Sequence, residues 1–313
     1  MSDAPKPVAV RIVRILLLAL LAYFAVVFFS SRGLVFQAKT SVAERRPAGA
    51  EQIWFESPGQ KTEAWFLPPT VAPQGPAPLI IFAHGGPELI DDWASAFAPP
   101  RARGIGVLLV EFPGYGRSTG SPSEASVKAV LQQGYDWATK RPDIDPTKII
   151  LYGRAVGGAA VATLLDGTNK PAAVILESTF SNGGYFAKKF FAPGFLARDR
   201  FDTLSAITTF KGQAPIIVIH GSSDEVIQPN EAAILATAAG TEPIFLECGH
   251  FDCPRVWTQN IFPALIAAKV LPESAPKPPA PPAPPAPPVV AAGSGEGSGS
   301  GAADGSGSGS GAK

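Results

Sequence analysis

Short apolar runs recur through the middle of the chain, and segments with helical patterns lie between them. Six runs are nearly continuous in apolar residues, as strands buried on both faces of a parallel sheet are: residues 79–83, 107–110, 149–151, 173–176, 216–219 and 244–246. Two earlier stretches, 52–56 and 62–66, alternate in part, as paired antiparallel strands do. The pattern predicts an α/β fold, with a mostly parallel sheet and helices on both faces.

Helix boundaries can be predicted at two places. The stretch Ser121-Pro122-Ser123-Glu124 has the order of a capping box, with Ser121 as the N-cap and Pro122 as the first helical residue. This helix is expected to end near Thr139. A final helix is expected from about Pro254 to Val270.

An uncharged apolar run from Ile15 to Ser31 lies near the N-terminus, between Arg14 and Arg32. Its length is near the lower limit for a membrane-spanning helix, about 17 residues. A cleaved signal peptide has a similar pattern, but the end of this run lacks an A-x-A-like cleavage site. The sequence therefore favours an N-terminal transmembrane signal anchor over residues 1–32, followed by a linker over residues 33–49.

Basic residues on the two sides of this run bear on topology. Lys6, Arg11 and Arg14 precede it and favour an N-terminus inside the cell. Basic residues also follow the run, so the charge asymmetry is weak. We expect a single-pass membrane protein whose main domain lies outside the cytoplasm.

The main domain is expected over residues 50–271. Within it, residues 178–213 form an aromatic-rich insertion that is either a short lid over a pocket or a cover for the sheet, and the lid is favoured. From Pro272 to Lys313 the chain consists of Pro-Ala and then Gly-Ser repeats. Such composition predicts a disordered tail, because it cannot bury a core.

Composition and charge exclude several classes of function. The 26 Lys and Arg residues balance the 26 Asp and Glu residues, and no basic run is interleaved with aromatics, so nucleic-acid binding is rejected. Neither metal-ligand spacing nor a cofactor motif is present, so we expect no metal and no cofactor. Cys248 and Cys253 would pair in an oxidising compartment, but two unpaired thiols are the favoured interpretation.

The stretch from Gly153 to Gly157 follows an apolar strand and precedes a run of small, helix-forming residues. A strand, a sharp turn and a helix form the context of the nucleophile elbow, G-x-S-x-G. Here the central residue is Ala155. The frame of a serine hydrolase is therefore present without its attacking oxygen.

Three histidines, all beside glycines at predicted strand ends, supply the remaining chemistry. The His84-Gly85-Gly86 loop follows an early strand, where such hydrolases take one backbone N–H of the oxyanion hole. Gly86 and Val156 are therefore the candidate donors to a tetrahedral intermediate. His84 itself is expected to shape the loop.

Asp224 and His250 are the candidate acid and base of a triad. Asp224 lies in the loop after the next-to-last strand, where the H-G-x-x-D-x-V spacing favours it over its neighbour Glu225. His250 follows the last strand. The order 155, 224, 250 is the nucleophile–acid–base order of this fold.

Together these blocks resemble the α/β-hydrolase superfamily, and within it the membrane-anchored, short-lid group of protein depalmitoylases and monoacylglycerol-lipase-like serine hydrolases. The resemblance covers roughly residues 50 to 270. It rests on the following blocks: His84-Gly85-Gly86 with Asp91-Asp92-Trp93, Phe112-Pro113-Gly114-Tyr115-Gly116-Arg117-Ser118-Thr119-Gly120, Gly153-Arg154-Ala155-Val156-Gly157-Gly158, Glu177-Ser178-Thr179-Phe180, His220-Gly221 with Asp224, and Gly249-His250-Phe251-Asp252. It implies the α/β-hydrolase fold and ester, thioester or acylglycerol-like substrates.

The resemblance also implies serine at position 155, where this chain has Ala155. Without a hydroxyl no acyl-enzyme forms there, so that chemistry is expected to be lost or strongly reduced. One hypothesis is a hydrolase-family protein that acts on or binds a small-molecule or lipid-like acyl substrate, with the acid–base pair acting alone as a general base if turnover remains. The other is a catalytically inactive binding or scaffold module at the cell envelope.

Overall fold

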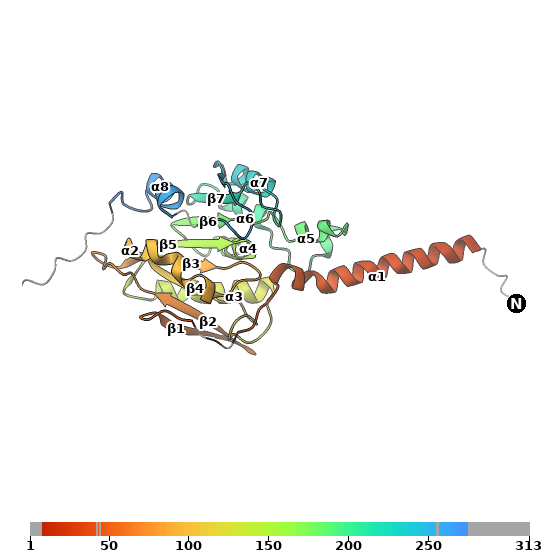
Figure 1. Ribbon diagram of the computed structural model, residues 1–313, viewed down its shortest axis with the longest axis horizontal. Coiled ribbons are helices and arrows are strands. Elements are labelled where there is room, and N and C mark those ends of the chain that lie inside the picture. Colours follow the sequence, from red (N-terminus) through yellow and green to blue (C-terminus); the bar gives the residue numbers. More distant parts are fainter. Residues whose placement is uncertain (1–7, 42, 44, 255–256, 275–313) are drawn as a thin grey trace, which may run out of the picture. The chain divides into compact units, whose positions relative to one another are not determined.

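Eight strands form one sheet in the order β1-β2-β4-β3-β5-β6-β7-β8 (Figure 1). The computed structural model describes residues 8–41, 43, 45–254 and 257–274. The strands are β1 (Glu51–Ser57), β2 (Gln60–Leu67), β3 (Ala77–Ala83), β4 (Gly106–Val110), β5 (Ile144–Arg154), β6 (Ala173–Glu177), β7 (Ile216–Gly221) and β8 (Ile244–Leu246). The β1–β2 and β2–β4 pairs are antiparallel and the others are parallel. The predicted mostly parallel α/β sheet is confirmed.

The two faces of the sheet carry separate apolar cores. Along β3, Leu79 and Ile81 belong to one core while Ile80 and Phe82 belong to the other, because successive side chains point to opposite faces. The first face is covered by α3 (Glu124–Thr139), α4 (Val156–Ala162), α6 (Thr203–Phe210) and α7 (Asn230–Ala239). The second is covered by the short helices η1 (Ile90–Asp92), η2 (Ala94–Phe97), α2 (Ala98–Ala102), η4 (Trp257–Ile261) and α8 (Phe262–Ala267). Helices on both faces are thus confirmed.

Strand β8 differs from the prediction of a strand buried on both faces. It lies at the edge of the sheet, and Phe245 keeps 47% of its surface exposed. An apolar run of three residues does not reveal whether other elements cover both faces of the strand, so the burial predicted from the sequence is wrong here.

The N-cap of α3 also differs from the prediction. Ser123, rather than Ser121, caps the helix and exchanges hydrogen bonds with Ser126. Glu124 accepts bonds from the backbone N–H groups of Arg200 and Phe201 instead of closing a box with Ser121. The predicted end of the helix at Thr139 is confirmed.

The last helical segment is shorter than predicted. From Trp257 onward the described part is the π-helical turn η4, which continues as α8 and ends at Ala267 rather than near Val270. Pro263 near the start of α8 has no N–H to donate to the preceding turn, which accounts for the change of helical pitch.

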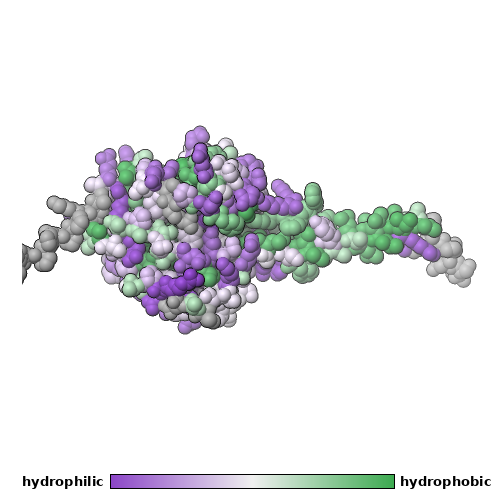
Figure 2. Space-filling view, viewed as in Figure 1, coloured by the Kyte–Doolittle hydropathy of each residue, from purple (hydrophilic) through white to green (hydrophobic). Residues whose placement is uncertain are grey.

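Helix α1 (Val8–Phe36) is long and apolar enough to cross a membrane, and Figure 2 shows its exposed apolar surface. It continues four residues beyond Arg32, into the stretch that the sequence predicted as a linker. That stretch then packs on the main domain, where Gly116 N donates to Lys39 O at 2.8 Å. The predicted tail lies, from residue 275 onward, outside the described residues.

The first turn of α4 packs directly on the end of β3. A Cβ atom at Gly157 would lie 2.1 Å from the carbonyl oxygen of Ala83, so only glycine fits. On the other side of the turn, a Cβ at Gly153 would lie 2.2 Å from the carbonyl oxygen of Gly157. The two glycines therefore hold β5, α4 and β3 in contact around position 155.

Replacing Gly157 with alanine is expected to lower the free energy of unfolding by about 3 kcal/mol or more, because the backbone of β3 cannot move away. Urea unfolding of the full chain in detergent measures this change. Gly33→Ala is the matched control, since a Cβ there meets nothing within 4 Å. Equal stability of the two variants would contradict the packing described.

Candidate active site

Asp224 and His250 form a buried pair at the carboxyl edge of the sheet. His250 Nδ1 lies 2.7 Å from Asp224 Oδ2, and the side chains are 3% and 0% exposed. Because the Asp224 carboxylate can only accept a hydrogen bond, it stabilises the tautomer of His250 that carries its proton on Nδ1. This leaves Nε2 as the basic nitrogen. This is the arrangement that a general base needs.

Several donors hold the Asp224 carboxylate in its charged form. Its Oδ1 accepts from Val226 N at 2.9 Å and Ile227 N at 2.8 Å, and His220 Nε2 lies 3.4 Å from its Oδ2. Burial alone would raise the pKa of Asp224, but the bonds from His220, His250 and the backbone outweigh it, so the pKa lies below its ordinary value. The acid is therefore ionised at neutral pH.

Ala155 occupies the sharp turn between β5 and α4. Its backbone has φ 49° and ψ −120°, a region that residues with a Cβ rarely adopt. The turn is fixed by Ala155 N, which donates to Glu177 O at 2.9 Å, and by Thr179 Oγ1, which donates to Ala155 O at 2.6 Å. The strained elbow is thus complete although its central residue carries no nucleophile.

The two predicted oxyanion residues lie on neighbouring segments. Val156 is the first residue of α4, and Gly86 lies in the loop after β3. Gly157 is in close contact with the carbonyls of Ala83 and His84, so the first turn of α4 lies beside the start of that loop.

His84 has the structural surroundings expected of a loop-shaping residue. Its Nδ1 lies 2.8 Å from Gly85 O and its Nε2 lies 2.6 Å from the buried Glu111 carboxylate. Burial lowers the pKa of His84, but the charge of Glu111 and its hydrogen bond outweigh burial and leave the pKa raised. His84 is therefore engaged in fixing the loop.

A buried ionic network that the sequence analysis missed ties the His250 loop to position 155. Arg154 is 2% exposed, forms ion pairs with Glu88 and Glu177, and donates to the backbone carbonyl of His250. Trp93 Nε1 donates to Glu88 at 3.1 Å. The sequence indicated this network only through Arg154, a charged residue within an apolar stretch. It did not indicate which residues Arg154 would contact.

Cys248 and Cys253 form a disulfide that closes the loop carrying His250. The favoured prediction of two unpaired thiols is wrong. The loop folds back on itself because Gly249 N donates to Asp252 Oδ1 at 2.6 Å, and this turn brings the two cysteine Cα atoms to 5.0 Å. His250 thus lies on a short loop that the disulfide closes.

The last turn of α1 lies over the loop after β3 that carries Gly86. A Cβ at Gly86 would be 2.8 Å from Val35 O, and Tyr115 Oη donates to Phe36 O. The Phe36 ring is 1% exposed and packs on Phe201 of the insertion. Val35 and Phe36, which the sequence analysis assigned to a linker, therefore form one side of the candidate site.

Within residues 8–41, 43, 45–254 and 257–274, no group of three or more His, Cys, Asp or Glu side chains is placed to hold a metal ion.

The family of the chain follows from comparison with known proteins. Residues 80–296 match the family model described as "Alpha/beta hydrolase family". The chain belongs to the alpha/beta hydrolase family. An esterase of Pyrococcus furiosus shares the fold, with a TM-score of 0.57 at 15% identity over 74% of this chain and 97% of that one.

Two relatives of this alpha/beta hydrolase are similar over most of the domain. The protein Rv2307c of Mycobacterium tuberculosis is 29% identical over 220 residues, which cover 69% of this chain and 75% of that protein. The alpha/beta hydrolase domain-containing protein WAV2 of Arabidopsis thaliana is 28% identical over 223 residues, which cover 65% and 70% of the two chains. These matches support the hydrolase family and do not identify a substrate.

Replacing Asp224 with asparagine is expected to lower the free energy of unfolding at pH 7 by about 1–3 kcal/mol, since a buried charged acceptor is lost. Because the folded pKa is depressed, the contribution of Asp224 is complete above the unfolded value of about 3.9 and is lost as the pH falls. The variant should therefore lose less stability than the parent between pH 5 and pH 2. Urea unfolding across that range, with the exposed Asp136→Asn as control, tests this; identical pH slopes for the parent and Asp224→Asn would contradict it.

Proposed function

We propose that this alpha/beta hydrolase binds an acyl ester, thioester or acylglycerol-like group at the Asp224–His250 pair, without a covalent acyl-enzyme step. The observation that carries the proposal is the buried 2.7 Å pair beside a strained elbow that holds Ala155. Strain of this kind costs of order 1–3 kcal/mol and is a feature of functional sites.

The individual parts support acyl recognition. Two backbone N–H groups, at Gly86 and Val156, are the proposed oxyanion donors, and a substrate carbonyl would accept from them. His250 Nε2 is the proposed base and Asp224 its orienting acid. Arg154 is proposed as a positioning residue, because it holds the carbonyl of His250 itself.

The absence of a hydroxyl at Ala155 limits the rate of hydrolysis that this site could reach. Loss of the nucleophile from a serine protease lowers turnover about 10⁶-fold, and the oxyanion hole and binding alone leave roughly 10³–10⁴ over water. Any remaining turnover here would require His250 to activate water directly.

We further propose a membrane-bound, extracytoplasmic location. The Cys248–Cys253 disulfide supports it, since such bonds persist in oxidising compartments. Helix α1 supports the membrane anchor by its length and apolar composition.

A second candidate function is a catalytically inactive binding or scaffold module. The observation that favours it is the burial of Ala155, at 5% exposure, and of His250, at 3%. In the closed arrangement described, a substrate reaches these residues only when the covering segments move.

Restoring the nucleophile separates the two functions. The full-length Ala155→Ser variant is expected to hydrolyse p-nitrophenyl esters and acyl thioesters at least about 10³-fold faster than the parent. Adding His250→Ala to that variant should return the rate to the parent level.

Three results distinguish the proposals. A gain with Ala155→Ser that depends on His250 supports an intact acyl site. Inactivity of a folded Ala155→Ser variant would reject it and favour the scaffold. Parent activity that His250→Ala abolishes would instead identify base catalysis without a covalent step.

A further inference from the structure

The segment from α5 to η3 exposes three phenylalanine rings. It runs from α5 (Gly184–Lys189) to η3 (Gly194–Leu196), and we call it the α5–η3 segment. Phe191 is 95% exposed, Phe195 75% and Phe190 41%. A group of large apolar side chains on a surface marks an interaction site rather than a solvent-facing loop.

The α5–η3 segment is packed against α1. Val27 of α1 lies in one apolar cluster with Ala187 and Ala192, and the hydroxyl of Tyr23 donates to the carbonyl of Phe190. These contacts place the phenylalanine rings beside the apolar helix, on the side where Figure 1 shows α5 next to α1.

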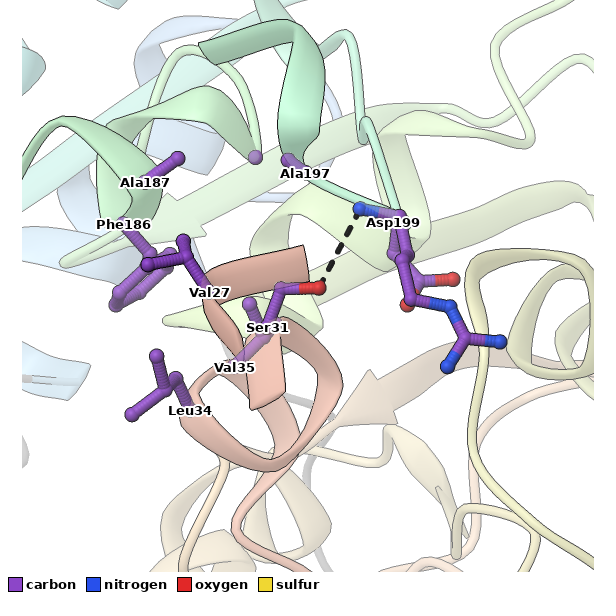
Figure 3. A pocket seen from close by; sticks show the side chains of 10 residues that line it. Val27, Ser31, Leu34, Val35, Phe186, Ala187, Ala197 and Asp199 are labelled. Atoms are coloured by element: carbon purple, nitrogen blue, oxygen red, sulfur yellow. Dashed lines mark hydrogen bonds between the residues drawn. The ribbon is translucent and has the colours of Figure 1, made fainter. Parts of the chain in front are cut away.

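The contact continues toward the end of α1, and Figure 3 shows how closely the two elements meet there. Ser31 accepts from the backbone N–H of Arg198 at 3.5 Å, and Arg32 pairs with the buried Asp199 at 2.8 Å. The crevice between them has a volume of only about 10 Å³. That is room for about one water molecule, so α1 and the segment form one packed unit.

The length of the apolar run determines how deep this unit must lie if α1 spans a bilayer. The uncharged run from Ile15 to Ser31 is about 25 Å long as a helix, while the hydrocarbon core is about 30 Å thick. The uncharged run is therefore no longer than the hydrocarbon core is thick, and all of it is needed to span the core. Contacts with the α5–η3 segment begin at Tyr23, only about 14 Å along the helix from Arg14. Half of the spanning run therefore faces the segment.

We propose that the α5–η3 segment is inserted into the lipid leaflet beside α1, with Phe191 and Phe195 among the acyl chains. The partner is the bilayer itself, because the exposed rings continue the apolar surface of the helix that enters it. A second protein at this place would have to displace the lipid that surrounds α1.

The charges at the border of the segment fit the same partner. Lys188, Arg198 and Arg200 are exposed there, and their long stems allow the charged ends to reach phosphate headgroups. The acidic residue of this stretch, Asp199, is buried against Arg32 and does not face the surface. The border is therefore cationic around an apolar centre, as membrane-surface segments are.

This insertion does not depend on the proposed acyl chemistry, since it rests on α1 and on exposed rings alone. It would also bring the covered site to the membrane surface, because the last turn of α1 lies on Gly86. A lipid-like acyl group would then approach from the leaflet.

A single-cysteine label tests the insertion. Cys248 and Cys253 are joined, so under non-reducing conditions the thiol of a Phe191→Cys variant reacts alone with a nitrobenzoxadiazole dye. The full chain is reconstituted in phosphatidylcholine–phosphatidylglycerol vesicles, with and without bromine on the lipid acyl chains. Phe245→Cys, at an exposed phenylalanine of β8, is the matched control.

The proposal predicts blue-shifted emission at position 191 and at least a twofold loss of intensity with brominated lipid, and neither effect at position 245.

Because Phe191 has φ 50°, Phe195→Cys provides a second position if the first variant does not fold. Water-like, unquenched emission at both positions 191 and 195 would overturn the proposal. So would blue-shifted emission that brominated lipid leaves unquenched, since a second protein copy would then cover the rings. Mass spectrometry showing that the membrane-bound chain lacks α1 would overturn it as well.

Discussion

The close approach of α4 to the end of β3 is the constraint on which the site depends. Gly157 leaves no room for a side chain against Ala83, and Gly153 leaves none against Gly157. The turn between β5 and α4 is therefore forced into the left-handed region at Ala155. The elbow follows from backbone packing, so it persists whatever side chain stands at its centre.

A second set of contacts holds His250 in relation to this elbow. Arg154 connects the elbow to the carbonyl of His250, while Glu88 and Glu177 neutralise its buried charge. The disulfide closes the same loop from the other side. Breaking such a buried ionic pair is strongly destabilising, because one charge stays unpaired. The elbow and the His250 loop are thus maintained by interactions that do not involve the side chain of residue 155.

Strong local signals made most of the fold predictable from the sequence. The continuous apolar runs located the strands, and glycines at strand ends located the elbow and the Asp224–His250 pair. What the sequence did not reveal were pairings between distant segments. One such pairing brings Val35 and Phe36, which composition assigned to a linker, against the loop that carries Gly86.

The remaining differences have local physical causes. The spacing of two cysteines five residues apart does not reveal whether the chain turns between them. Here the Asp252 carboxylate accepts from Gly249 N and stabilises the turn that brings the cysteines together. Likewise, Ser121 and Ser123 offer equivalent capping hydroxyls, and the choice between them depends on Glu124 being engaged by the backbone of Arg200. Such choices are made by tertiary contacts rather than by propensity.

We propose that the candidate site lacks only the oxygen atom of a nucleophile at position 155. The most direct test is intact-mass and peptide mass spectrometry of the full chain after exposure to an alkyl fluorophosphonate. A single adduct is expected at position 155 in the Ala155→Ser variant, none at that position in the parent, and a much slower reaction when His250→Ala is added. A folded Ala155→Ser variant that forms no adduct would contradict the claim, because the geometry described here would then fail to activate the restored hydroxyl.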